Sequence, residues 1–110
     1  MKLKNQTKNV YLTTDLKEVK DISDKFLGLL KKSNSRSLMF KTRFGIHTLF
    51  LKTKIDVIVL DNMLRVRILK TLNPNRMFIY SPRFKIVVEL PQRTVQKTGT
   101  EIGDQLKMIK

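Results

Sequence analysis

The chain has 110 residues, of which 23 are Lys or Arg and 9 are Asp or Glu, and its formal net charge is +14. This length allows one domain with one core, and a hydrophobic share of 41% is sufficient for folding. The chain has no cysteine, which excludes disulfides, thiolate metal sites and cysteine nucleophiles.

We expect a cytoplasmic protein without a membrane partner. The amino-terminal residues lack the apolar segment of a secretory signal. No apolar run approaches the roughly 18 residues that a membrane-spanning helix needs. The absence of cysteine is also typical of a reducing compartment.

The first third of the chain predicts a basic arm, a strand and a helix. Residues 1–9 are polar and basic, and we expect a flexible arm that precedes a single β-domain over 10–110. Val10–Thr13 is a candidate strand. Residues 24–30 have apolar side chains three and four positions apart, which predicts a short helix.

From residue 37 onward the pattern predicts a series of strands. Their expected ranges are 38–40, 46–51, 55–60, 64–68, 76–80 and 84–90. The hairpin over 55–69, with its turn at Asp61-Asn62, has the strongest local signal. In the last of these strands Phe84, Ile86, Val88 and Leu90 are expected on one face.

The carboxy-terminal residues predict a second short helix and a final strand. Pro91 suits the first turn of a helix through Lys97, and Gly99 suits its end. The final strand is expected over 106–109. Six or seven strands with two short helices predict a mainly β fold, a small antiparallel β-sandwich or barrel.

Positive charge is concentrated in the region with the longest apolar alternations. Between Lys25 and Lys85 the chain has fourteen basic residues and two acidic ones, Asp56 and Asp61. The charge therefore belongs to what we expect to be a folded domain. A compact body with this field favours a polyanionic partner, and the abundant polyanion of a cell is nucleic acid.

The candidate nucleic-acid interface is formed by basic residues and an aromatic ring within this region. Arg65 and Arg67 are expected to face the same way on one strand. Phe44, like Tyr80, lies beside basic residues and is a candidate for base stacking. The whole candidate set is Lys32, Arg36, Lys41, Arg43, Phe44, Lys52, Lys54, Arg65, Arg67, Arg76, Arg83 and Lys85.

The order of short motifs resembles the domain of unknown function family 192. The first of them are Gly28-Leu29-Leu30, Ser37-Leu38-Met39-Phe40, Ile46-His47-Thr48 and the run from Ile55 to Asp61. At the carboxy-terminal end Val88-Glu89-Leu90-Pro91, Thr94, Gly99 and Gly103-Asp104 are similar to the family's Leu-Glu-Leu-Pro-Ala-Gly-Thr and Gly-Asp. Together these motifs cover about residues 20–107.

The resemblance implies a mostly antiparallel, jelly-roll-like β-sandwich, and it implies no enzyme activity. The chain departs from the family pattern at several positions. Lys54 stands where the family usually has proline, Ser37 replaces a glycine, and Gln92-Arg93 replaces Ala-Gly. A shared fold does not fix a shared function.

A small polar pocket is the alternative functional site. His47, the one histidine, could pair with Asp56 and Glu89 as acid, base or ligand. A structural histidine, and a buried Asp56 that accepts backbone hydrogen bonds, are the more common arrangements. One histidine without cysteine makes a poor zinc site, and the four glycines do not match a phosphate-binding loop. We therefore predict no catalytic residue, no metal and no cofactor.

Two functions remain open. The first is a non-enzymatic protein that binds structured RNA in preference to DNA, with a ribosome-associated protein as its most concrete form. Terminal lysines, Lys2, Lys4, Lys8, Lys107 and Lys110, would extend the contact. The second is a small-ligand-binding β-sandwich whose pocket contains His47, Asp56 and Glu89. Attachment to an anionic membrane surface ranks last, because no basic amphipathic helix is predicted.

Overall fold

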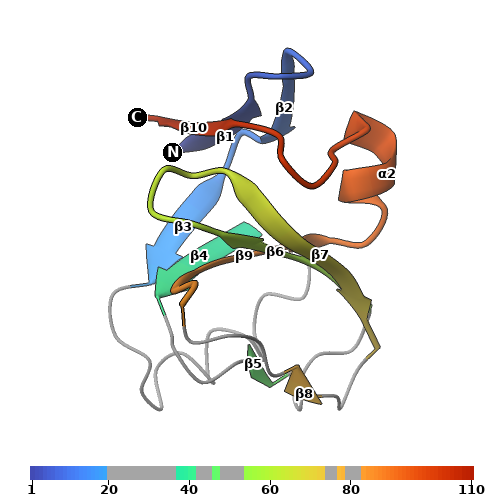
Figure 1. Ribbon diagram of the computed structural model, residues 1–110. Coiled ribbons are helices and arrows are strands. Elements are labelled where there is room, and N and C mark those ends of the chain that lie inside the picture. Colours follow the sequence, from blue (N-terminus) through green and yellow to red (C-terminus); the bar gives the residue numbers. More distant parts are fainter. Residues whose placement is uncertain (20–36, 42–45, 48–53, 74–76, 79–82) are drawn as a thin grey trace.

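The computed structural model describes residues 1–19, 37–41, 46–47, 54–73, 77–78 and 83–110 (Figure 1). Within these ranges the elements are β1 (Lys2–Asn5), β2 (Val10–Thr13), β3 (Leu16–Val19), β4 (Ser37–Lys41), β5 (Ile46–His47), β6 (Ile55–Leu60), β7 (Val66–Leu72), β8 (Met77–Phe78), β9 (Ile86–Pro91), α2 (Thr94–Thr98) and β10 (Leu106–Ile109). The mainly β fold predicted from the sequence is confirmed.

The strands form a small sandwich. A three-stranded sheet with the order β10-β1-β2 covers one face of a five-stranded sheet with the order β3-β4-β9-β6-β7 (Figure 1). The two-stranded sheet β5-β8 lies on the opposite side of the five-stranded sheet. Among the described pairs, β3 and β4 run parallel and the others run antiparallel.

The predicted hairpin over 55–69 is confirmed. β6 and β7 pair antiparallel from Ile55 opposite Leu72 to Leu60 opposite Val66. Asp61 forms the turn, because its Oδ1 accepts hydrogen bonds from the backbone N–H groups of Met63 (2.9 Å) and Arg65 (3.0 Å). Every residue of β6 is buried, as the nearly continuous apolar run predicted.

Alternation along the strands divides the buried residues into two cores. The upper core lies between the two larger sheets and contains Leu3, Leu12, Leu16, Met39, Ile58, Leu60, Val66, Ile86, Val88, Leu90 and Leu106. The lower core lies on the other face of the five-stranded sheet and contains Leu38, Phe40, Ile55, Val57, Val59, Leu72 and Val87. Phe84 packs against the lower core, so the prediction that it shares a face with Ile86 is wrong.

The predicted flexible arm over residues 1–9 is wrong. Lys2–Asn5 forms β1, which lies between β10 and β2 in the three-stranded sheet. The alternation of Lys2, Leu3, Lys4 and Asn5 gives this strand one exposed and one buried side, with Leu3 fully buried. The sequence did not indicate this strand, because its composition is mostly polar and only two of its four side chains point inward.

The second predicted helix begins later than expected. Pro91 is the last residue of β9, and α2 covers Thr94–Thr98. Gly99 ends the helix with φ 66°, as predicted. Arg93 precedes the helix with φ 70°, a left-handed conformation that costs a non-glycine residue free energy. The first predicted helix, over 24–30, lies outside the described residues.

A buried polar network joins the two ends of the chain. Asn5 Nδ2 donates hydrogen bonds to Thr100 Oγ1 (3.1 Å) and Asp104 Oδ2 (2.9 Å), and Asn5 Oδ1 accepts one from Lys8 N–H (3.0 Å). The Lys8 Nζ atom lies 3.5 Å from Asp104 Oδ1. Burial alone would raise the pKa of Asp104, but the hydrogen bonds from Asn5 and the backbone, with the charge of Lys8, lower it. Asp104 is therefore held as a carboxylate.

Replacing Asn5 by alanine should destabilise the protein by about 2–3 kcal/mol, because Thr100 and Asp104 would lose a buried donor. Gln6→Ala is the matched control, since the Gln6 side chain is exposed. Urea unfolding monitored by circular dichroism measures both changes. Equal midpoints for the two variants would contradict the importance of the network.

Replacing Arg93 by glycine should stabilise the protein by about 1 kcal/mol, because glycine adopts positive φ without steric cost. Arg93→Ala removes the same charge but keeps a Cβ atom, and should give no gain. The melting temperatures of the two variants distinguish backbone strain from a charge effect. A gain shared equally by both would assign the effect to charge.

Candidate nucleic-acid interface

The structure describes half of the residues that the sequence predicted as an interface. Lys41, Lys54, Arg65, Arg67, Arg83 and Lys85 are described. Six others lie outside the described residues, namely Lys32, Arg36, Arg43, Phe44, Lys52 and Arg76. Tyr80, the other candidate for stacking, also lies outside them.

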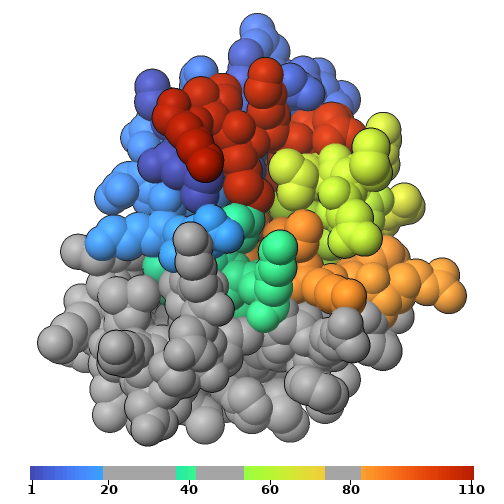
Figure 2. Space-filling model, turned by 90° about the vertical axis from the view of Figure 1, so that its left-hand side faces the viewer, coloured from blue at the N-terminus to red at the C-terminus, as the bar shows by residue number. Residues whose placement is uncertain are grey.

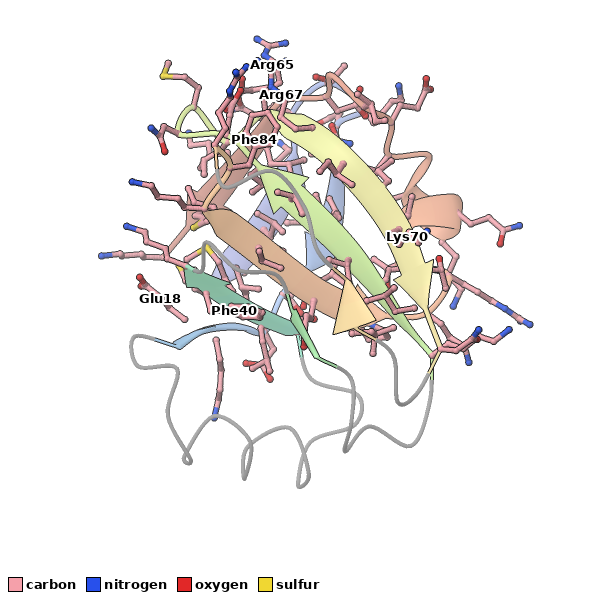
Figure 3. All side chains as sticks on the ribbon, turned by 60° about the horizontal axis from the view of Figure 1, so that its bottom comes forward. Glu18, Phe40, Arg65, Arg67, Lys70 and Phe84 are labelled. Carbon is pink, nitrogen blue, oxygen red and sulfur yellow. The ribbon has the colours of Figure 1, made fainter. Side chains whose placement is uncertain are left out.

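Part of the described set gathers at one end of the five-stranded sheet. The register places Lys41 opposite Ile86, Ile86 opposite Leu60, and Leu60 opposite Val66. Lys85, Arg65 and Arg67 flank this row in the sequence. Figure 3 shows Arg65 and Arg67 at the same end of β7, with Lys70 farther along the strand. Lys54 precedes β6 at the opposite end, so it does not join this group.

The two arginines of this group are already engaged within the protein. Arg67 Nε lies 2.8 Å from Asp61 Oδ2, and Arg65 Nη1 donates a hydrogen bond to the carbonyl oxygen of Gly103 (2.9 Å). Burial alone would raise the pKa of Asp61, but hydrogen bonds from Arg65 N–H, the Arg67 side chain and Met63 N–H lower it. Asp61 therefore offsets one of the two positive charges.

A second basic group lies on the outer face of the three-stranded sheet. Lys4 pairs directly with Lys107 of β10 on one side and with Tyr11 of β2 on the other. Lys2 lies two residues before Lys4 and shares its face. We call Lys2, Lys4, Tyr11 and Lys107 the lysine face. The sequence predicted these lysines as terminal contacts, and the fold brings them together.

The lysine face combines cations with an exposed aromatic ring. Tyr11 is 45% exposed. The ammonium groups of Lys2 and Lys4 lie 5.8 and 5.7 Å from the centroid of its ring, within cation–π range. The twelve residues of β1, β2 and β10 include no acidic residue. Positive charge on this face therefore has no carboxylate partner within its own strands.

Tyr11 is the member of this face that sequence reasoning missed. The strand Val10–Thr13 was predicted, but its exposed side had no assigned partner strand. Only the pairing of β2 with β1 puts Tyr11 opposite Lys4. The signal that could have identified it is an alternation of residue types. In Lys2-Leu3-Lys4 and in Tyr11-Leu12, polar or amphipathic residues lie next to a buried leucine, which is typical of a strand with one exposed face.

Asp56 is buried and has a structural role in the described fold. Its Oδ2 accepts a hydrogen bond from the backbone N–H of Val95 (2.9 Å), and its Oδ1 accepts one from the Thr71 hydroxyl (3.0 Å). Asp56 thereby caps the start of α2, which receives no side-chain cap from Arg93. This agrees with the structural alternative for Asp56.

Glu89 is buried on the other face of the same sheet. It pairs with Leu38 and Val57, which belong to the lower core, whereas Asp56 lies on the face of the upper core. The predicted convergence of Asp56 with Glu89 is therefore wrong, because the sheet separates the two carboxyl groups. The side chain of His47 lies outside the described residues.

The buried carboxyl of Glu89 is protonated near neutral pH. Its side chain is 2% exposed, and Oε1 has no hydrogen-bond partner in the described structure. Burial raises the pKa of Glu89 to about 8. A neutral carboxylic acid is tolerated among apolar neighbours, whereas an unpaired carboxylate is not.

Two clefts open on the described surface. One, of about 360 Å³, is lined by Lys54, Asp56, Thr71, Gln92, Arg93, Val95 and Gln96. The other, of about 280 Å³, lies at the edge of the sandwich and is lined by Met1, Glu18, Met39, Lys41, Leu64, Ile86, Met108 and Lys110. Neither cleft contains Glu89, so neither is the predicted ligand pocket.

The described ranges offer neither a cluster of metal-binding side chains nor a membrane-spanning helix. These residues contain no group of three or more His, Cys, Asp or Glu side chains that could hold a metal ion. They also contain no helix that is long and apolar enough to cross a membrane.

Sequence comparison finds relatives that cover nearly the whole chain. A UPF0127 protein of Pyrococcus horikoshii is 31% identical over 109 residues, which are 94% of this chain and 95% of the relative. A UPF0127 protein of Thermococcus sibiricus is 32% identical over 109 residues, 93% of this chain and 71% of the relative. No protein-family model matches the chain.

Solved structures support the fold. A Sinorhizobium meliloti protein described as a candidate transcription regulator has a TM-score of 0.73 and 17% identity, and the match covers 96% of this chain and 89% of that one. A Novosphingobium aromaticivorans protein of unknown function has a TM-score of 0.74 and 11% identity, with 97% and 82% covered. At these identities the likeness shows the fold alone.

The raised pKa of Glu89 should make stability fall with rising pH. Between about pH 4.5 and 8 the folded state keeps a proton that the unfolded state releases, so the free energy of unfolding should decrease by about 1.4 kcal/mol per pH unit within this window. Glu89→Gln keeps the shape and removes the titration. Urea unfolding at several pH values measures both proteins.

The comparison with Glu89→Gln cancels every titration that the two proteins share. The acidic groups with lowered pKa, Asp61 and Asp104, titrate below this window. Parallel stability profiles for the two proteins from pH 5 to 8 would contradict a neutral Glu89.

Proposed function

The chain belongs to the UPF0127 family, and we propose that this member is a non-enzymatic, cytoplasmic protein that binds nucleic acid, with RNA preferred over DNA. The lysine face is the observation that carries the proposal. It presents three lysines and an exposed tyrosine on adjacent strands without an acidic residue in those strands. Phosphates and bases are the chemical groups that such a surface attracts.

The distribution of acidic residues supports a positive surface. Of the seven described acidic residues, five are engaged within the protein or buried. These five are Asp56, Asp61, Glu89, Glu101 and Asp104. The formal net charge of +14 already includes every carboxylate, so a large excess of positive charge remains. Such a field speeds encounter with a polyanion and raises affinity at low salt.

RNA is favoured over DNA because of the shape of the surface. In the described fold a sheet face carries the charge, and no recognition helix projects from it for insertion into a DNA major groove. β-sheet surfaces with aromatic side chains suit RNA, whose unpaired bases are accessible for stacking. Ribosomal RNA is the most concrete partner, since it is abundant and rich in such bases.

The group formed by Lys41, Lys85, Arg65 and Arg67 is a second contact zone in this proposal. Its arginines are held by internal contacts, so it should contribute less per residue than the lysine face. We also infer that the chain is a member of the domain of unknown function family 192. The left-handed conformation of Arg93, where that pattern has glycine, supports this assignment.

Binding to ribosomal RNA should show a steep negative slope of log affinity against log salt, because several phosphates are neutralised. A variant in which Lys2, Lys4 and Lys107 are replaced by glutamine should reduce the magnitude of that slope by about 2. Filter binding from about 50 to 200 mM salt measures both proteins.

A second triple variant provides the control. In this variant glutamine replaces Lys41, Lys54 and Lys85. It removes the same charge, but from residues that the sequence predicted as part of the interface. Its slope should change less than that of the lysine-face variant. A flat slope for the wild-type protein, or no binding at low salt, would contradict nucleic-acid binding. Equal losses in the two triples would contradict the lysine face as the main site.

A further inference from the structure

We propose that Tyr11 stacks on an unpaired base, so that the lysine face binds single-stranded RNA in preference to duplex RNA. This inference rests on the proposed function and narrows its partner. It is carried by the position of the ring, the two ammonium groups beside it and the pairing of the strands that hold it.

The strand pairing holds the Tyr11 ring outward. The next residue, Leu12, is buried in the upper core and anchors β2 against the five-stranded sheet. The pairing of Tyr11 with Lys4 in β1 fixes the direction of its side chain. With 45% of its surface exposed, the ring is accessible to a partner, although a tyrosine would normally bury most of its apolar area. An exposed aromatic ring on a sheet is a suitable platform for a base.

The neighbouring lysines suit the sugar-phosphate chain on either side of a stacked base. Their ammonium groups lie 5.8 and 5.7 Å from the ring centroid, which is farther than a stacked base would lie. An exposed cation–π contact is weaker than base stacking on an aromatic ring. A base can therefore displace these ammonium groups, and each flexible lysine can then contact a phosphate. Lys107, opposite Lys4, extends the positive track across β10.

A duplex cannot use Tyr11 in this way. The bases of a double helix are stacked on each other, and A-form RNA offers proteins mainly its phosphates and hydroxyl groups. A duplex would contact the lysines alone. An unpaired strand would contact both the lysines and the ring, which adds about tenfold in affinity for one stacked base.

The test compares two labelled RNAs of equal nucleotide number, a 24-residue oligouridine and a blunt-ended duplex of 12 base pairs without an unpaired loop. Fluorescence anisotropy at constant salt measures their affinities for the wild-type protein, Tyr11→Phe and Tyr11→Leu. Tyr11→Leu should weaken oligouridine binding about tenfold and leave duplex binding unchanged. Tyr11→Phe should bind both RNAs like the wild-type protein, because phenylalanine keeps the aromatic face.

A second measurement reports stacking directly. The chain has two tyrosines and no tryptophan, so Tyr80→Phe leaves Tyr11 as the one source of tyrosine emission. Oligouridine should quench that emission, and the duplex should not. This readout keeps the proposal testable if Tyr11→Leu proves unstable in thermal unfolding.

The outcomes distinguish a failure of stacking from a failure of nucleic-acid binding. If neither RNA binds the wild-type protein, both nucleic-acid binding and stacking are overturned. If both RNAs bind equally and Tyr11→Leu has no effect, stacking is overturned while nucleic-acid binding stands. If neither RNA binds but vesicles containing phosphatidylglycerol do, the lysine face is a lipid-binding surface and both proposals are overturned.

Discussion

The placement of β1 between β10 and β2 is the constraint on which the described surface depends. Asn5 connects this strand to Thr100 and Asp104, which lie nearly one hundred residues away in the sequence. Both polar atoms of the Asn5 side-chain amide form hydrogen bonds. Nδ2 donates to Thr100 and Asp104, and Oδ1 accepts from the backbone N–H of Lys8. Buried polar networks of this kind stabilise one arrangement strongly, because any other leaves donors or acceptors unsatisfied. The first and last strands are therefore adjacent (Figures 1 and 2).

The same strands provide both the core and the candidate interface. In β1 the inward residues are Leu3 and Asn5, and the outward residues are Lys2 and Lys4. β10 repeats this division, with Leu106 inside and Lys107 outside. Loss of Leu3 packing would consequently disturb the lysine face. Figure 2 shows the amino-terminal and carboxy-terminal segments forming one continuous surface above β4 and β9.

Local sequence patterns predicted much of the fold. β2 and β6 have the predicted bounds, and the 55–69 hairpin follows from a turn residue between two apolar strands. β1 was not predicted, since its inward residues are few and its identity as a strand depends on partners far away in the sequence. β3 likewise gains its pairing from β4, about twenty residues later.

The candidate site was less accessible to sequence reasoning than the fold. Asp56 and Glu89 each lie in a correctly predicted strand, but only the pairing of β6 with β9 shows that they face opposite cores. Charge counting likewise favoured residues 25–85, whereas the pairing of β1 with β10 and β2 assembled a separate group of lysines. Distances along the chain carry no information on such pairings.

The adjacency of the first and last strands has a kinetic consequence. Closing a loop of about one hundred residues costs more entropy than closing a hairpin, and it is slow for the same reason. β6 can pair locally with β7, and β1 with β2, whereas the pairing of β1 with β10 must wait until β10 emerges during synthesis. A nascent chain would thus complete its partner-binding surface, with Lys107, at the last stage of folding, after its central sheet has begun to form.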